Sequence, residues 1–223
     1  MKRTLPVLLS FNGGYVDTAG FLALQGLFTA HVTGNFVTLA AALVLGTSGI
    51  LTKLLALPVF CVVVVVTRLA SYGLPGRHWP VLQTMLTLKL LLMIAGTVLA
   101  IRLGPFANGD SGSAMLTGLT FVAAMAIQNA AHRIHLGNTP PSTIMTGTTT
   151  QIMIDIADAI HGLLPEKREL TRARMRDMAL AMASFAIGAA LAAFLFSTVG
   201  MWCFAVAPTV ALATRLVATR WPS

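Results

Sequence analysis

The hydrophobic residues of this chain gather into eight long apolar segments with short polar connections between them. The segments lie at about residues 5–28, 34–51, 54–74, 82–103, 113–131, 143–164, 177–198 and 200–219. Residues 54–70 contain five consecutive valines and a single charge, Arg68. With its flanks this stretch reaches the roughly 20 residues that a helix needs to cross a bilayer core. The pattern predicts an all-α polytopic membrane protein, a helical bundle with six to eight membrane segments in one domain over residues 1–223.

Composition supports lipid as the solvent for most of the surface. Hydrophobic residues make up 56% of the chain, charged residues 10%, and the mean hydropathy is +0.81. Soluble domains carry about 25% charged residues. The two cysteines, Cys61 and Cys203, lie within apolar segments as expected of packing residues, and they indicate neither a disulfide framework nor a zinc site. We expect no cofactor and no metal.

Basic residues concentrate at the two ends of the chain and in one connection. The net charge is +8, and the residues concerned are Lys2, Arg3, Lys167, Arg168, Arg172, Arg174, Arg176, Arg215 and Arg220. Such clusters mark cytoplasmic segments under the positive-inside rule. We therefore expect both termini and the connection at residues 166–176 to be cytoplasmic. Glu166 and Glu169 dilute the positive charge of that connection, which argues against a nucleic-acid partner.

A short motif occurs twice. Residues 33–35, Thr-Gly-Asn, return as residues 146–148, Thr-Gly-Thr, and aligning the two copies brings Asp17 within a residue or two of Gln128 and Asn129. The order of the segments predicts an internal duplication, with repeat 1 at about residues 5–103 and repeat 2 at about residues 113–219. Internally duplicated bundles with interrupted helices are typical of small transporters.

The number of crossings stays open at this point. If all eight segments cross, the repeats hold four spans each and are parallel. If the segment after each Thr-Gly motif is short or re-entrant, the repeats hold three spans each and are inverted in the membrane. Counts of basic residues do not separate the two arrangements. The polar groups of residues 146–160 favour incomplete crossing, because too many of them would otherwise face lipid.

The first copy of the motif also carries a family resemblance. The stretch Gly14-Tyr15-Val16-Asp17-Thr18-Ala19-Gly20-Phe21, followed by Gly26-Leu27-Phe28 and His31-Val32-Thr33-Gly34-Asn35, resembles the YoaK-like family of prokaryotic integral membrane proteins. Length and the pattern of spans agree with that family over essentially the whole chain. The resemblance implies a multi-pass protein of the prokaryotic inner membrane. It brings no substrate, catalytic residue or cofactor, because the family is one of uncharacterised proteins.

Asp17 is the sharpest candidate for a functional group inside the membrane. It lies roughly 18 Å along the first segment, where an ionised carboxylate is costly. Gly13, Gly14 and Gly20 would let another helix or a solute approach the backbone around it. We expect Asp17→Asn to fold but to lose transport or its pH dependence. The alternative is a structural carboxylate, hydrogen-bonded between helices, with Lys89 considered either as its ion partner or as a lysine that snorkels to the interface.

A polar stripe follows the second motif. Thr148, Gln151, Asp155 and Asp158 fall on one face of the sixth segment, in a helix that is otherwise apolar. The stripe predicts either a wall of a solute or proton path, or an interfacial helix whose polar face meets cytoplasmic water. A metal site on this helix is disfavoured because no spaced ligand signature is present.

Polar residues also cluster at the end of the fifth segment, where Gln128, Asn129 and His132 lie on adjacent helical rows. If the fold brought His132 to Asp155 or Asp158, the pair could relay protons. A helix end at the water interface would show the same pattern.

The Thr-Gly motifs themselves suggest helix starts. Thr33, Gly34 and Asn35 in the first copy, and Thr146, Gly147 and Thr148 in the second, combine a capping residue with a flexible one. The free N–H groups at Asn35 and Thr148 are therefore predicted to bind an anion or a polar solute. The alternative is a tight turn between neighbouring helices.

Functional motifs of soluble enzymes are missing from the sequence. It has no Walker-type phosphate loop, no Gly-x-Ser-x-Gly elbow and no His-Glu-x-x-His helix. We therefore expect no enzyme but a secondary transporter or permease, whose partners are the lipid bilayer and a small solute that the sequence does not identify. The alternatives are a non-transporting scaffold or sensor subunit and, less favoured, an intramembrane enzyme. Homo-oligomerisation is left open.

Overall fold

The computed structural model describes residues 3–73, 80–143, 145–162 and 165–221, and within these ranges the chain is helical without strands. The elements are α1 (Thr4–Ala23), η1 (Val32–Gly34), α2 (Asn35–Leu45), α3 (Ile50–Gly73), α4 (Val81–Leu103), α5 (Gly112–His135), α6 (Met145–His161), α7 (Pro165–Val199), η3 (Gly200–Ala205) and α8 (Val206–Ala218). The prediction of an all-α membrane bundle is confirmed.

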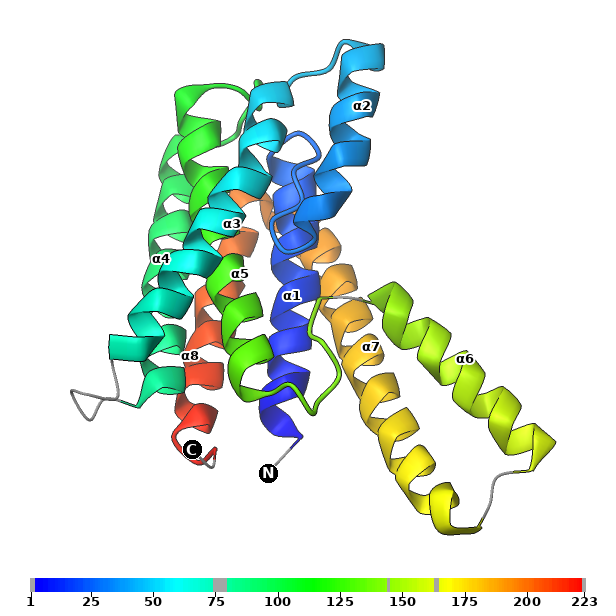
Figure 1. The fold of residues 1–223 in the computed structure, drawn as a ribbon. Coiled ribbons are helices and arrows are strands. Elements are labelled where there is room, and N and C mark those ends of the chain that lie inside the picture. Colours follow the sequence, from blue (N-terminus) through cyan, green and yellow to red (C-terminus); the bar gives the residue numbers. More distant parts are fainter. Residues whose placement is uncertain (1–2, 74–79, 144, 163–164, 222–223) are drawn as a thin grey trace.

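The helices α1, α3, α4, α5 and α7, and α8 together with η3, reach about the length of a membrane span, whereas α2 and α6 are shorter. The helices α3, α4 and α5 and the continuous stretch Glu166–Ala218 are long and apolar enough to cross a membrane. That stretch comprises α7 and α8, which run in opposite directions on either side of η3 (Figure 1). With 20 residues, α1 also reaches the length of a span, about 30 Å. By contrast, α2 has 11 residues and α6 has 17.

The helices α2 and α6 return to the end of the bundle from which the chain has just come (Figure 1). After α1 the chain turns back along the bundle, and α2 then runs to the end at which α1 stopped. After α5 the chain turns back in the same way, and α6 runs to the opposite end, where α5 stopped. This course is the one expected of the re-entrant arrangement, one of the two that the sequence left open, and the number of crossings stays a prediction.

The contacts between helices match when α1–α4 are exchanged with α5–α8. The contact of α1 with α7 corresponds to that of α5 with α3, and the contact of α1 with α8 corresponds to that of α5 with α4. Likewise α2 packs on α3 as α6 packs on α7. Because α1 and α5 run in opposite directions (Figure 1), the two halves have the arrangement of inverted repeats. The internal duplication, and the orientation of its two halves in a membrane, stay predictions.

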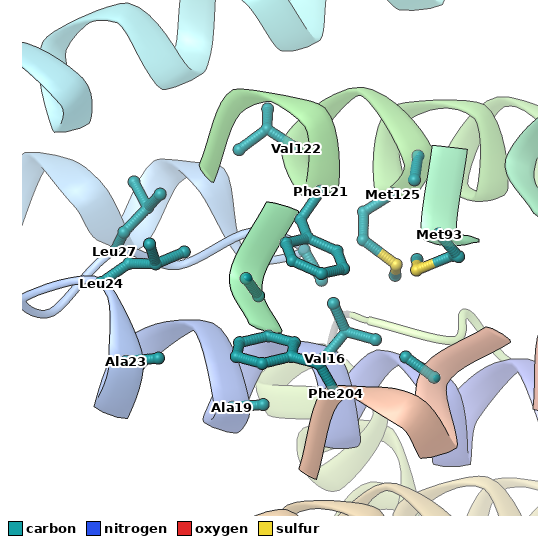
Figure 2. Close-up of a cluster of buried hydrophobic side chains, with 14 of the residues drawn as sticks. Val16, Ala19, Ala23, Leu24, Leu27, Met93, Phe121, Val122, Met125 and Phe204 are labelled. Atoms are coloured by element: carbon teal, nitrogen blue, oxygen red, sulfur yellow. The ribbon is translucent and has the colours of Figure 1, made fainter. Parts of the chain in front are cut away.

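Two hydrophobic clusters fill the bundle. The central cluster contains Val16, Met93, Phe121, Met125 and Phe204 among others, and the rings of Phe121 and Phe204 stack at 4.9 Å (Figure 2). We call the second the termini-side cluster, because it lies toward the end of the bundle that holds the two chain termini. It consists of Leu5, Leu9, Leu82, Met85, Leu86, Ile127, Ala131, Leu136 and Ala218. Cys203 belongs to the central cluster, whereas Cys61 is exposed on α3, so the interpretation of the cysteines as packing residues was wrong for Cys61.

Several segment boundaries differ from the prediction, and the second helix, for example, ends at Leu45 rather than near residue 51. The first helix ends at Ala23 rather than near residue 28, because Gln25 and Gly26 have φ angles of 55° and 80° that reverse the chain. The seventh begins at Pro165 rather than near residue 177, so the basic connection is helical and extends α7 to 35 residues. Hydrophobicity marks where a helix enters lipid and therefore misses the part of a helix that continues into water.

A carboxylate ties the loop after α4 to the start of α3. Asp110 accepts hydrogen bonds from the backbone N–H groups of Gly49, Ile50 and Thr52 at 3.0, 2.9 and 3.0 Å. Burial alone would raise the pKa of the Asp110 carboxyl, but these backbone donors outweigh it and hold the pKa below its ordinary value. Asp110 therefore acts as the N-terminal cap of α3, supplied from the connection between α4 and α5.

Asp110→Ala is expected to lower the free energy of unfolding by about 1–2 kcal/mol, the usual cost of a lost helix cap. Because the folded-state pKa is depressed, the contribution is present above the unfolded-state pKa of about 3.9 and disappears as the pH falls through the folded-state value. Thermal unfolding of the detergent-solubilised variant at pH 7 and below pH 4 measures both effects. Glu169→Ala, at an exposed position on α7, should leave the melting temperature unchanged.

Candidate functional site

Asp17 holds the loop that returns after α1. Its Oδ1 accepts hydrogen bonds from the backbone N–H groups of Thr29, Ala30 and His31 at 2.7, 2.8 and 3.4 Å, and the Thr29 hydroxyl lies at 3.5 Å. The Asp17 side chain is buried deep in the bundle. The backbone donors ahead of η1 are thus occupied by a carboxylate of the same chain.

The first Thr-Gly motif closes this loop. Asn35 Oδ1 accepts from Phe28 N–H at 2.9 Å, and Asn35 Nδ2 donates to the Phe28 carbonyl at 2.8 Å. The Phe28 ring covers Gly34, where a Cβ atom would come within 2.9 Å of the ring. Thr33 is exposed, and neither η1 nor α2 begins with a side-chain cap. The motif is therefore a tight turn, as the alternative interpretation held, and the expected threonine cap is not formed at Thr33.

The second half fixes its returning loop from the corresponding position. Asn129 on α5 accepts a hydrogen bond from the Thr143 hydroxyl at 2.7 Å, and Gln128 Nε2 donates to the Ser142 hydroxyl at 3.2 Å. The separation along the chain is 14 residues in both contacts, against 12 to 14 for Asp17 and its loop. In each half, then, a polar side chain of the first long helix anchors the loop that leads into the short helix.

Gln128 also joins the two halves. Its Nε2 donates to the carbonyl of Leu9 at 2.9 Å, and Asn12 Nδ2 donates to its Oε1 at 3.5 Å. Both Asn12 and Gln128 are fully buried. The contact places amide groups between α1 and α5, the two helices that correspond to each other in the inverted arrangement.

His132 and Asp155 have separate partners. His132 Nε2 lies 3.3 Å from the Thr139 hydroxyl and 3.5 Å from the Thr139 carbonyl. Asp155 is paired with Arg174 instead, and no interaction between His132 and either Asp155 or Asp158 occurs among the residues that the structure describes. The His–Asp proton relay considered from the sequence is thus not assembled in this conformation.

The polar stripe of α6 is turned toward α7. Thr148 and Asp155 are buried, Gln151 is half-buried, and Asp158 is exposed, as are Thr146 and Gly147. Asp155 accepts hydrogen bonds from Arg174 Nε at 3.0 Å, from Arg174 Nη2, and from Gln151 Nε2 at 2.8 Å. Burial would raise the pKa of the Asp155 carboxyl, but the bonds from Arg174 and Gln151 keep it below its ordinary value. Through the ion pair between Asp155 and Arg174, the polar stripe therefore attaches α6 to the basic start of α7.

A groove lies beside the ion pair of Asp155 and Arg174, between the loop after α5 and the start of α7. Its lining includes Asn138, Thr139, Thr171, Arg174 and Met178. The groove joins polar groups from both connections at this end of the bundle and is open to the surface.

The glycines around Asp17 are in close contact with other parts of the protein and leave no space for a solute beside them. A Cβ atom on Gly14 would lie 2.1 Å from the carbonyl oxygen of Phe185 in α7, and one on Gly13 would lie 2.8 Å from the carbonyl oxygen of Ser142. On Gly20 it would meet the Thr29 side chain at 2.8 Å. Of the two roles considered from the sequence, the structure shows close packing of backbone and side chains.

Three polar residues are buried in the interior of the bundle in a way that the sequence did not predict. Ser10 and Asn12 lie on α1 near Asp17, and Lys89 lies on α4 with no exposed surface. Lys89 neither pairs with Asp17 nor reaches the interface, and its Nζ has no hydrogen-bond partner within the described ranges. The signal available was polarity within an apolar segment, which does not tell which face of a helix is buried.

The comparisons with known proteins agree with the membrane fold. The sequence matches the family model described as "Protein of unknown function (DUF1275)" over residues 5–217. It is also 28% identical over 195 residues to the UPF0700 transmembrane protein YoaK of Bacillus subtilis (strain 168), in an alignment that covers 86% of this chain and 83% of that protein. No solved structure matches the chain significantly.

Proposed function

The chain belongs to the DUF1275 family, and we propose that this membrane protein is a secondary transporter or permease for a small solute in the prokaryotic inner membrane. The observation that carries the proposal is the inverted pair of short helices, α2 and α6, each entered from a loop that turns back along the bundle (Figure 1). Inverted repeats with interrupted helices, whose ends lie near the bilayer midplane, are the architecture of many secondary transporters.

The polar interior supports the same function. Asp17, Gln128 and Asn129 sit inside a bundle whose surface is largely apolar, and the first two are buried within it. Polar groups at such depth are costly and usually face protein partners or a solute path. Here they fix the two returning loops, so a movement of one half against the other would carry the loops as rigid parts. Alternating access in inverted-repeat transporters works by such relative movement.

The orientation follows from charge. We infer that both termini and the start of α7 face the cytoplasm, because the start of α7, which carries Arg172 and Arg176, lies at the same end of the bundle as the two termini (Figure 1). The ion pair between Arg3 and Asp177, with 2.6 Å between Arg3 Nε and Asp177 Oδ1, joins α1 to α7 at this end.

Flux into proteoliposomes tests the proposal. The purified full-length protein is reconstituted, and uptake of radiolabelled metabolites is compared with that of empty liposomes and of liposomes holding an unrelated membrane protein. Transport predicts uptake above both controls for at least one solute, saturating with its concentration. If no solute of a broad panel crosses faster than in the empty liposomes, the scaffold or sensor alternative replaces the transporter.

A further inference from the structure

The buried lysine of α4 has no counter-charge in the part of the chain that the structure describes. The chain has only seven acidic residues, namely Asp17, Asp110, Asp155, Asp158, Glu166, Glu169 and Asp177, and the structure describes all of them. Asp17 is engaged by the loop at residues 29–31, and Asp155 is engaged by Arg174. The other five lie in the α4–α5 connection or at the α6–α7 end. An ammonium group at Lys89 is therefore left without a carboxylate partner.

Lys89 belongs to a polar layer between the two hydrophobic clusters. On α4 it follows Leu86 of the termini-side cluster and precedes Met93 of the central cluster. On α1, Ser10 and Asn12 lie between Leu9 and Tyr15 of the same two clusters. Since α5 and α8 each contact both α1 and α4, the four helices surround a common interior. Lys89 and the two α1 residues thus occupy the same level of that interior.

Three polar atoms in this layer lack partners within the described part of the chain. They are Lys89 Nζ, Asn12 Oδ1 and Ser10 Oγ, and each of these three residues is 0% exposed. Buried polar atoms are nearly always hydrogen-bonded in folded proteins. An unpaired buried ammonium is especially costly. Three orphaned groups at one level of the bundle are the kind of arrangement that a bound species would complete.

We propose that Lys89 is the charged group of an intramembrane site for a small carboxylate that also carries a hydrogen-bond donor. The carboxylate would supply the missing counter-charge to Lys89 Nζ. A hydroxyl or amino group on the same molecule would donate to Asn12 Oδ1, which a simple halide cannot do. This inference rests on the proposed transport function and adds to it the chemical class of the solute.

The test compares Lys89 with the other buried lysine. Lys53 on α3 is 4% exposed, but its Nζ donates to the carbonyl of Ser48 at 3.2 Å. Thermal unfolding of the full-length protein in detergent is followed with and without glycolate, the smallest hydroxycarboxylate. Its uncharged analogue glycolamide and sodium chloride at equal ionic strength are the controls. The variants are Lys89→Met and Lys53→Met, which remove the charge and keep the length of the side chain.

Glycolate is expected to raise the apparent Tm of the wild type by about 3 °C or more once it is well above its Kd, and glycolamide and chloride are not. Without any addition, Lys89→Met should melt about 2–4 °C higher than the wild type, because an uncompensated charge is gone. It should no longer respond to glycolate. Lys53→Met should melt lower than the wild type and keep the response.

Three results would overturn the inference. A glycolate response that survives in Lys89→Met would place any site elsewhere. A lower Tm of Lys89→Met without ligand, as for Lys53→Met, would make Lys89 a structural residue. A response to chloride equal to that to glycolate, or no response to glycolate, would exclude a small carboxylate as the ligand. Flux separates this inference from the proposed function, because uptake of a neutral solute without glycolate binding would leave the transporter intact, and glycolate binding without any flux would leave the site intact.

Discussion

Asp17→Ala is expected to lower the free energy of unfolding by about 3–5 kcal/mol, since three backbone N–H groups lose their acceptor and each unsatisfied buried donor costs about 1–3 kcal/mol. The variant should melt about 6–20 °C below the wild type and yield less folded protein. The reason lies in the loop at residues 29–31, whose N–H groups all point at one carboxylate oxygen. Thermal unfolding in detergent and the yield of monodisperse protein measure the loss.

Two further variants are expected to lose less stability than Asp17→Ala. Asp17→Asn keeps a carbonyl oxygen as acceptor but loses the charge, and charge-assisted hydrogen bonds are roughly twice as strong as neutral ones. It should therefore melt between the wild type and Asp17→Ala. Asn129→Ala removes the bond from the Thr143 hydroxyl and the bond that Asn129 Nδ2 donates to the Met125 carbonyl, and should cost about 1–2 kcal/mol. If Asp17→Asn melted normally and had lost only flux, Asp17 would be the functional carboxylate that the sequence suggested.

Gly14→Ala is expected to separate α1 from α7. A Cβ atom at this position would lie 2.1 Å from the Phe185 carbonyl oxygen and 2.9 Å from its carbon, so backbone would have to move. Gly188 makes the reciprocal contact, since a Cβ atom added there would lie 2.2 Å from the Phe11 carbonyl oxygen. Overpacking of a core commonly costs 1–3 kcal/mol, and because no side-chain rotation relieves this clash we expect about 3 kcal/mol or more, measured as a fall in Tm.

Other glycines provide the controls for this substitution. At Gly118 the nearest atom to an added Cβ is the end of the flexible Leu27 side chain, at 2.5 Å, so Gly118→Ala should cost less than Gly14→Ala. At Gly112 nothing lies within 4 Å, and Gly112→Ala should be neutral or slightly stabilising. Equal melting temperatures for Gly14→Ala and Gly112→Ala would mean that α1 and α7 do not pack backbone to backbone.

Hydrophobic periodicity was sufficient for the helices themselves. A long apolar segment in lipid forms a helix, because a helix satisfies all its backbone hydrogen bonds internally. The eight helical segments and the assignment to membrane proteins could therefore be predicted from the sequence. The lengths of α1 and α7 did not, since a reversal at Gln25 and a polar extension before residue 177 leave hydrophobicity uninformative. The re-entrant course was left open because an 11-residue helix followed by a short loop has the same composition as part of a span.

The position of the candidate site was predictable and its contacts were not. Asp17, Gln128 and Asn129 stood out as polar residues at matching places of the two predicted repeats, and in the structure each forms hydrogen bonds with the loop that leads into α2 or α6. Their partners are backbone N–H groups and hydroxyls, which carry no distinctive sequence signal. Lys89 was noticed as a charge, but its isolation depends on where all seven acidic residues lie in three dimensions.

The transport proposal depends on the two halves being inverted, and the sidedness of two connections tests this most directly. Single cysteines replace Asn108, in the loop after α4, and Arg172, near the start of α7, after Cys61 and Cys203 have been changed to serine. The loop after α4 and the start of α7 lie at opposite ends of the bundle (Figure 1). An impermeant maleimide added to intact cells should label the cysteine at 108 and leave the cysteine at 172 unlabelled until the membrane is permeabilised. Labelling of both positions from the same side would mean that all eight segments cross and the repeats are parallel, which would contradict the inverted architecture.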